Sequence, residues 1–144
     1  MEPSQYIEIG LNDEKYALPI GDIQEIIRLQ TVTEIPNSEP ELVGVINLRG
    51  KIVPVMNLSK RFLAASRDTT ALSRIVIVQS LGSVVGLLVD RVFSVISFPE
   101  IGPPPHRSKL SDRGYIGGIG RSGDEWVCIL KLENVLHQGG ISVD

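Results

Sequence analysis

The chain is built from short runs of β-branched and other apolar residues, each closed by Gly, Pro, Asn or Asp. Such runs are typical of the strands of an all-β barrel or sandwich, because β-branched side chains fit a pleated surface and the closing residues favour turns. The runs that predict strands are residues 5–10, 14–19, 33–35, 44–48, 51–57, 74–79, 83–90, 91–97, 115–120 and 125–131. So many short strands in 144 residues do not fit one small sheet.

Turn-forming residues separate neighbouring runs at residues 11–14, 81–83 and 121–124. Asn, Asp and Gly tolerate the left-handed backbone of tight turns, so these positions predict three antiparallel hairpins. Helix start signals predict only short helices. They are expected at residues 22–27, 39–43, 58–63 and 133–136.

A stretch of small and polar residues at 64–70 divides the chain into two halves. Such a stretch is typical of a linker or a long loop. Each half carries about five predicted strands in about 70 residues, which is the size of an SH3-like barrel. Closing a sheet into a barrel removes its exposed edges. We therefore predict an all-β fold of two small barrels that share a core, on strand count alone.

The charge balance and the apolar runs exclude several classes of partner. Lys and Arg number 14 against 17 Asp and Glu, so the chain lacks the basic surface expected of a nucleic-acid or anionic-membrane binder. The longest apolar runs, 75–78 and 84–89, fall far short of the ~20 residues of a spanning helix, so direct membrane insertion is not expected. No secretion signal marks residues 1–10, which favours a cytoplasmic location.

The sequence offers little material for catalysis or for metal binding. His106, His137 and Cys128 are its only histidines and cysteine, too few for the usual four-ligand zinc site. Cys128 lies in the apolar run 126–130, where a buried and unreactive thiol is expected. The glycine-rich segment 114–120 matches neither a P-loop nor a dinucleotide fingerprint, and bulges or tight bends explain it better. We expect no catalytic residues, no metal and no cofactor.

The most informative segment is residues 44–55, where Arg49 lies between Gly44 and Gly50 at the junction of two apolar strands. Arg presents five donors in a planar fork that suits a carboxylate. Glu25 lies in a similarly apolar frame at residues 23–27. Two interpretations stay open from the residues alone: the two side chains form a pair, or they are unrelated surface charges.

Four segments of the first half carry a resemblance to a known family: 22–27 (DIQEII), 35–37 (IPN), 44–50 (GVINLRG) and 52–55 (IVPV). In order and spacing they resemble the bacterial chemotaxis coupling proteins, the CheW-like domain family. Three segments of the second half agree: 85–92, 115–119 and 129–136. The resemblance implies one domain over residues 5–138, with a first barrel over approximately 5–66 and a second over approximately 67–138.

The resemblance also implies a fold and a function. The implied fold is two intertwined five-stranded SH3-like β-barrels with a few short helices. The implied function does not include enzymatic activity. Members of this family are adaptors that connect the cytoplasmic tips of methyl-accepting chemoreceptors to the regulatory domain of a CheA-type histidine kinase. Such an adaptor is cytoplasmic and is recruited to membrane receptor arrays through protein contacts.

Seven residues are predicted to contact the receptor or the kinase. By resemblance, Glu25 and Arg49 match the family's acid and arginine that pair near the partner surfaces. The neighbouring positions implicated in partner contact are Ile23, Gly44, Asn47 and Ile52. Val95 joins Ile23 and Ile52 as an apolar candidate, because partner surfaces are enriched in large apolar side chains around an oriented charge. For each of these three, an ordinary position in a strand core is the alternative.

Two features depart from the family's commonest pattern. Asn57 stands where the family often has Asp, and Ile27-Arg28 stands where some members have Arg-Gly. They leave open whether the pathway is swimming chemotaxis or a related chemosensory system.

The competing function is a small-molecule-binding β-barrel protein whose pocket is the groove between two barrels. A purely structural oligomer is a third possibility.

Overall fold

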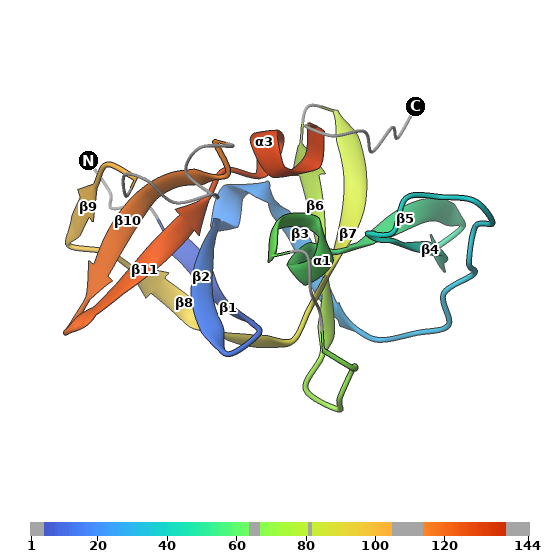
Figure 1. Ribbon diagram of the computed structural model, residues 1–144, viewed down its shortest axis with the longest axis horizontal. Helices are drawn as coiled ribbons and strands as arrows, with labels where there is room; N and C mark the ends of the chain where they lie inside the picture. Colours follow the sequence, from blue (N-terminus) through green and yellow to red (C-terminus); the bar gives the residue numbers. More distant parts are fainter. Residues whose placement is uncertain (1–4, 64–66, 81, 105–113, 138–144) are drawn as a thin grey trace.

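The computed structural model describes residues 5–63, 67–80, 82–104 and 114–137 (Figure 1). Almost all of the regular structure is β, and the helices are short. The elements are β1 (Gln5–Leu11), β2 (Glu14–Pro19), the 3-10 helix η1 (Ile20–Asp22), β3 (Ile23–Arg28), β4 (Leu42–Leu48), β5 (Lys51–Asn57), α1 (Leu58–Leu63), β6 (Arg74–Ser80), β7 (Ser83–Val89), β8 (Arg91–Ser97), β9 (Glu100–Gly102), β10 (Ile116–Ser122), β11 (Glu125–Leu130) and α3 (Leu132–His137). The predicted all-β class is confirmed.

The two halves of the chain repeat one order of elements. Each half has a hairpin, a bent strand, a second hairpin and a short helix: β1–β2, β3, β4–β5 and α1, then β6–β7, β8–β9, β10–β11 and α3. The second hairpins of the two halves lie at opposite ends of the long axis of the molecule (Figure 1). The repeat is one of topology, which explains why the residues themselves do not display it.

The two sheets are intertwined because each takes a hairpin from one half and the remaining strands from the other. Their strand orders are β8-β1-β2-β11-β10-β9 and β3-β6-β7-β5-β4. The exchanged hairpins join through parallel pairing of β2 with β11 and of β5 with β7. The boundary expected near residue 66 therefore separates the two halves of the chain, not the two sheets. The count of predicted strands does not show which strands pair, because the parallel pairing of the exchanged hairpins is fixed by contacts between residues far apart in sequence.

Each sheet closes into a five-stranded barrel through a bent edge strand. Only Phe98 and Pro99 separate β8 from β9, and these two arms of one bent strand occupy the two edges of the first sheet. In the second barrel, the chain beyond β3 reaches Thr33, which pairs with Val45 on the opposite edge strand β4 through backbone bonds of 2.8 and 2.9 Å. Closure leaves few unpaired strand edges.

Three groups of buried apolar side chains hold the molecule together. One fills the first barrel and includes Tyr6, Phe98 and Ile129. Another fills the second barrel and includes Ile46 and Val53. The largest group, the shared core, lies between the barrels and draws on β1, β2, β6, β7, α1 and α3. Burying apolar surface between the barrels makes them one folding unit.

Two of the predicted helices are wrong. Residues 22–27 form η1 and β3, because β-branched Ile23, Ile26 and Ile27 favour a strand and alternate between half-buried and exposed positions. Residues 39–43 form a turn followed by the start of β4. The predicted strand at 33–35 is reduced to the bridge at Thr33.

The helices predicted at 58–63 and 133–136 are confirmed as α1 and α3. His106 and residues 64–66 of the predicted linker lie outside the described residues. Within the ranges that the structure describes, no helix is long and apolar enough to span a membrane.

Candidate functional site

The hairpin of β4 and β5 presents Arg49 at its tip. Leu48 pairs with Lys51, so Arg49 and Gly50 form a two-residue loop. Both loop residues have positive φ, 51° and 85°, as a type I′ turn requires. Gly50 adopts this backbone freely, whereas an L side chain such as that of Arg49 does so rarely. The turn therefore holds the backbone of Arg49 in one unusual conformation.

Asn47 stabilises this turn from within the hairpin. Its Oδ1 accepts a hydrogen bond from the Gly50 N–H at 2.8 Å. Its carbonyl oxygen accepts another from Gln30 Nε2 at 3.2 Å, which links the hairpin to the chain beyond β3. Asn47 is exposed, but its side chain is already engaged in positioning the loop that carries Arg49.

Arg49 and Glu25 form the pair that the sequence left open. Nη1 of Arg49 donates to Glu25 Oε1 at 3.1 Å, and Nη2 donates to Oε2. The two hydrogen bonds lower the pKa of the Glu25 carboxyl and raise the pKa of the Arg49 guanidinium. Glu25 lies on edge strand β3 and Arg49 follows edge strand β4, so the pair joins the two edges of the second barrel.

Ile52 extends this surface with an exposed apolar side chain. It lies opposite Asn47 in the β4–β5 ladder and is 66% exposed, whereas the next residue, Val53, points into the barrel core. The alternative of an ordinary core position is therefore wrong for Ile52. We call Glu25, Asn47, Arg49 and Ile52 the hairpin surface: a fixed guanidinium beside an exposed aliphatic side chain.

Ile23 and Gly44 lie at less exposed positions than Ile52, and their contact with a partner stays a prediction. Ile23 is half-buried and packs against the shared core. Gly44 is buried, and a Cβ there would lie 2.2 Å from the carbonyl oxygen of Thr33. The bridge that closes the second barrel therefore requires glycine at this position.

Val95 lies on the other barrel. It is on β8, pairs with Ile7 of β1 and is 49% exposed. Phe93, on the same strand, is also partly exposed, and Lys15 Nζ and Arg91 Cζ lie 5.0 and 4.7 Å from its ring centroid. The structure thus brings Glu25, Asn47, Arg49 and Ile52 together on one barrel and places Val95 on a separate surface.

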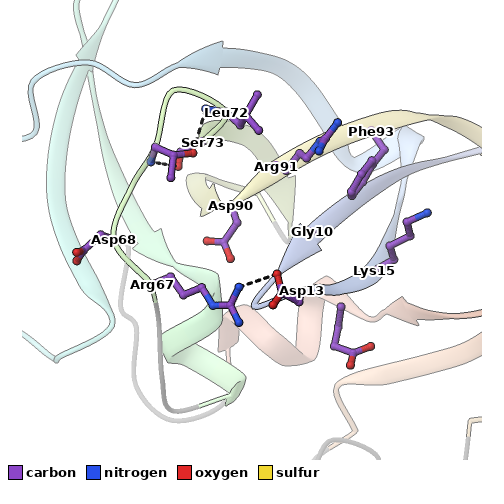
Figure 2. Close-up of a pocket in the computed structure, with 12 residues that line it drawn as sticks. Gly10, Asp13, Lys15, Arg67, Asp68, Leu72, Ser73, Asp90, Arg91 and Phe93 are labelled. Atoms are coloured by element: carbon purple, nitrogen blue, oxygen red, sulfur yellow. Dashed lines mark hydrogen bonds and ion pairs between the residues drawn. The ribbon is translucent and has the colours of Figure 1, made fainter.

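A cavity of about 380 Å³ lies where the barrels meet (Figure 2). Some of its charged side chains are engaged within the protein: Arg67 pairs with Asp13 at 2.6 Å, and Asp90 accepts a hydrogen bond from the Asn12 N–H at 2.7 Å. Within the described ranges, no three His, Cys, Asp or Glu side chains group so as to hold a metal ion. The groove expected for a small-molecule binder exists, and an ion pair between Arg67 and Asp13 lies in its wall.

Trp126 was missed by sequence reasoning, because its run 126–130 suggests a core strand throughout. It is 56% exposed and lies opposite Arg121, whose Cζ is 5.7 Å from the ring centroid. Trp126 is the second residue after the loop of the β10–β11 hairpin, as Ile52 is in the β4–β5 hairpin. Strand alternation within the run was the available signal.

In the same strand, half-burial raises the pKa of the Cys128 thiol.

Comparison with known proteins agrees with this geometry. The chain matches the family model of the CheW-like domain over residues 5–139. The chain belongs to the CheW-like domain family. It is 31% identical to chemotaxis protein CheW of Helicobacter pylori over 138 residues, 95% of this chain and 84% of that protein. It is also 31% identical to a probable chemotaxis protein CheW of Rhizobium etli over 136 residues, 93% and 88% of the two chains.

Among solved structures, the crystal structure of the scaffolding protein TtCheW from Thermoanaerobacter tengcongensis superposes with a TM-score of 0.88 and 37% identity. The match covers 97% of each chain. Membership of the CheW-like family and this structural match together support the predicted fold of two barrels and the role of a chemotaxis scaffold.

Proposed function

We propose that this chain is a non-enzymatic adaptor that couples methyl-accepting chemoreceptors to a CheA-type histidine kinase. Its partners are the cytoplasmic tips of the receptors and the regulatory domain of the kinase. It acts in the cytoplasm and reaches membrane receptor arrays through these protein contacts. Membership of the CheW-like family supports this role, and the hairpin surface supplies the observation that carries it.

The hairpin surface has the chemistry of a protein-binding site. Its guanidinium is fixed by an unusual backbone conformation, by Asn47 and by the bond to Glu25, so little side-chain freedom is lost when a partner binds. The exposed Ile52 beside it provides apolar surface to bury. Oriented charges contribute mainly to specificity and to the rate of encounter.

A second exposed surface suits an adaptor that must hold two partners at once. Val95 and Phe93 lie on the first barrel, away from the hairpin surface on the second. An adaptor with two separate surfaces can bind receptor and kinase together, and many weak contacts in an array give high avidity.

Reconstitution tests the proposed function. Receptor-containing vesicles and a CheA-type kinase from the same organism are mixed with or without the chain, and autophosphorylation of the kinase is followed. We expect receptor-dependent control of the kinase only when the chain is present. Receptor control that does not depend on the chain would contradict the proposal.

A further inference from the structure

Arg61 is a buried cation at the junction of the two halves of the chain. It lies on α1, and its side chain is 5% exposed. Among the buried residues of the described chain it is the only Lys or Arg. Burying a guanidinium is unfavourable unless its N–H groups are bonded, so its contacts indicate what its burial achieves.

The guanidinium bonds to parts of both halves. Nε of Arg61 donates to the carbonyl oxygen of Val135 in α3 at 2.7 Å, and Cζ lies 5.9 Å from the ring centroid of Tyr115. Nη1 lies 3.4 Å from Oε1 of Glu41. The carbonyl of Glu41 accepts a hydrogen bond of 2.7 Å from the Asn57 N–H, just beyond the paired residues of β4 and β5. Arg61 therefore connects the base of the β4–β5 hairpin to α3.

This arrangement serves geometry more than stability. Nη2 of Arg61 is buried and has no hydrogen-bond partner among the described residues. A buried ion pair is often no more stabilising than apolar side chains of similar volume, but it can define one arrangement of the elements that it joins. An apolar residue at this position would fill the same space and leave the hairpin base without its link to α3.

We propose that Arg61 is a positioning residue for partner binding. It fixes the base of the β4–β5 hairpin against α3 and thereby orients the hairpin surface relative to the first barrel. The effect on binding rests on the proposed function, in which the hairpin surface contacts the receptor or the kinase domain. The link between hairpin and helix does not depend on any partner.

Amide hydrogen exchange tests the link in the isolated protein. Arg61→Met replaces the guanidinium with an apolar side chain, and Lys60→Met, at an exposed neighbouring position on the same helix, is the matched control. We expect the Asn57 amide to exchange about tenfold faster in Arg61→Met and at the wild-type rate in the control, because exchange follows local opening. Equal rates in all three proteins would overturn the proposal.

Titration into the kinase regulatory domain and into a receptor cytoplasmic fragment tests the consequence. At equal folded fraction, we expect Arg61→Met to bind one of these two partners about tenfold more weakly, with partial recovery in Arg61→Lys and no change in Lys60→Met. If the loss of affinity is fully explained by the fraction of the variant that is unfolded, Arg61 is only a structural residue and the proposal is overturned. If Arg61→Met does not fold, Glu41→Leu cuts the same link from the hairpin side. If the wild type binds neither partner, the proposed function fails and the exchange rates alone decide the role of Arg61.

Discussion

Arg49 donates two hydrogen bonds to Glu25 and so joins the two edge strands of the second barrel. The backbone bridge between Thr33 and Val45, a few residues along the chain from this pair, closes the same barrel. The pair is at the surface, where exposed ion pairs contribute little to stability. It therefore orients a guanidinium that a partner can reach.

The fold is expected to survive removal of the Arg49 guanidinium. We expect Arg49→Ala to keep the wild-type circular dichroism spectrum and to lower the thermal midpoint by no more than about 3 °C, because backbone pairing still closes the barrel. The matched control is Arg28→Ala, at an exposed position on β3. A variant that is unfolded at 25 °C would show that the pair is structural.

The pair makes a small, pH-dependent contribution to stability. Its hydrogen bonds lower the folded-state pKa of Glu25 below the ordinary value of 4.5, so the contribution is complete above that value and is lost as the pH falls through the folded-state pKa. We expect the difference in thermal midpoint between wild type and Glu25→Gln to stay constant from pH 7 to about pH 5 and to shrink below that. A difference that persists unchanged to pH 3 would contradict this assignment.

Gly44 cannot carry a side chain. A Cβ at this position would lie 2.2 Å from the Thr33 carbonyl oxygen. That oxygen can move away only if the bridge between Thr33 and Val45 breaks. We expect Gly44→Ala to lower the free energy of unfolding by about 3 kcal/mol in urea denaturation. Gly21→Ala is the control, since nothing lies within 4 Å of its Cβ position. Equal losses in both variants would refute the steric explanation.

We expect Cys128 to be an unreactive thiol in the folded protein. Burial, with a smaller contribution from the charge of Glu14, raises its pKa above the ordinary value of 9.0, and the thiolate is the reactive form. At pH 8 we expect alkylation by iodoacetamide to be at least about tenfold slower in the folded protein than in urea. Equal rates would mean that the thiol is accessible and unperturbed.

The strands were predictable because their signals are local. A β-branched run and its closing turn lie within ten or so residues, and hairpins such as β1–β2 and β10–β11 follow from them directly. The parallel pairing of β2 with β11 has no local signal, and so the exchange of hairpins between halves was not predictable. Residues 22–27 were misassigned because a possible helix cap at Gly21 outweighed the β-branched residues, and the pairing with β6 that makes the segment a strand has no local signal.

The candidate site was predictable in part. Charge complementarity left it open whether Arg49 meets Glu25, the resemblance to the family implied that they pair, and the structure brings them together. Chemistry alone could not separate exposed Ile52 from half-buried Ile23, because the face of a strand that is buried depends on its neighbours. Trp126 is exposed for the same reason.

Titration tests directly whether the hairpin surface binds a partner. Wild type, Ile52→Ser and Ile101→Ser are titrated into the regulatory domain of a CheA-type kinase and into a receptor cytoplasmic fragment. Ile101, 51% exposed on β9 of the first barrel, is the matched control. We expect saturable wild-type binding, about tenfold weaker binding of one partner by Ile52→Ser, and no change in Ile101→Ser. Unchanged affinity of Ile52→Ser for both partners, or no wild-type binding to either, would contradict the account.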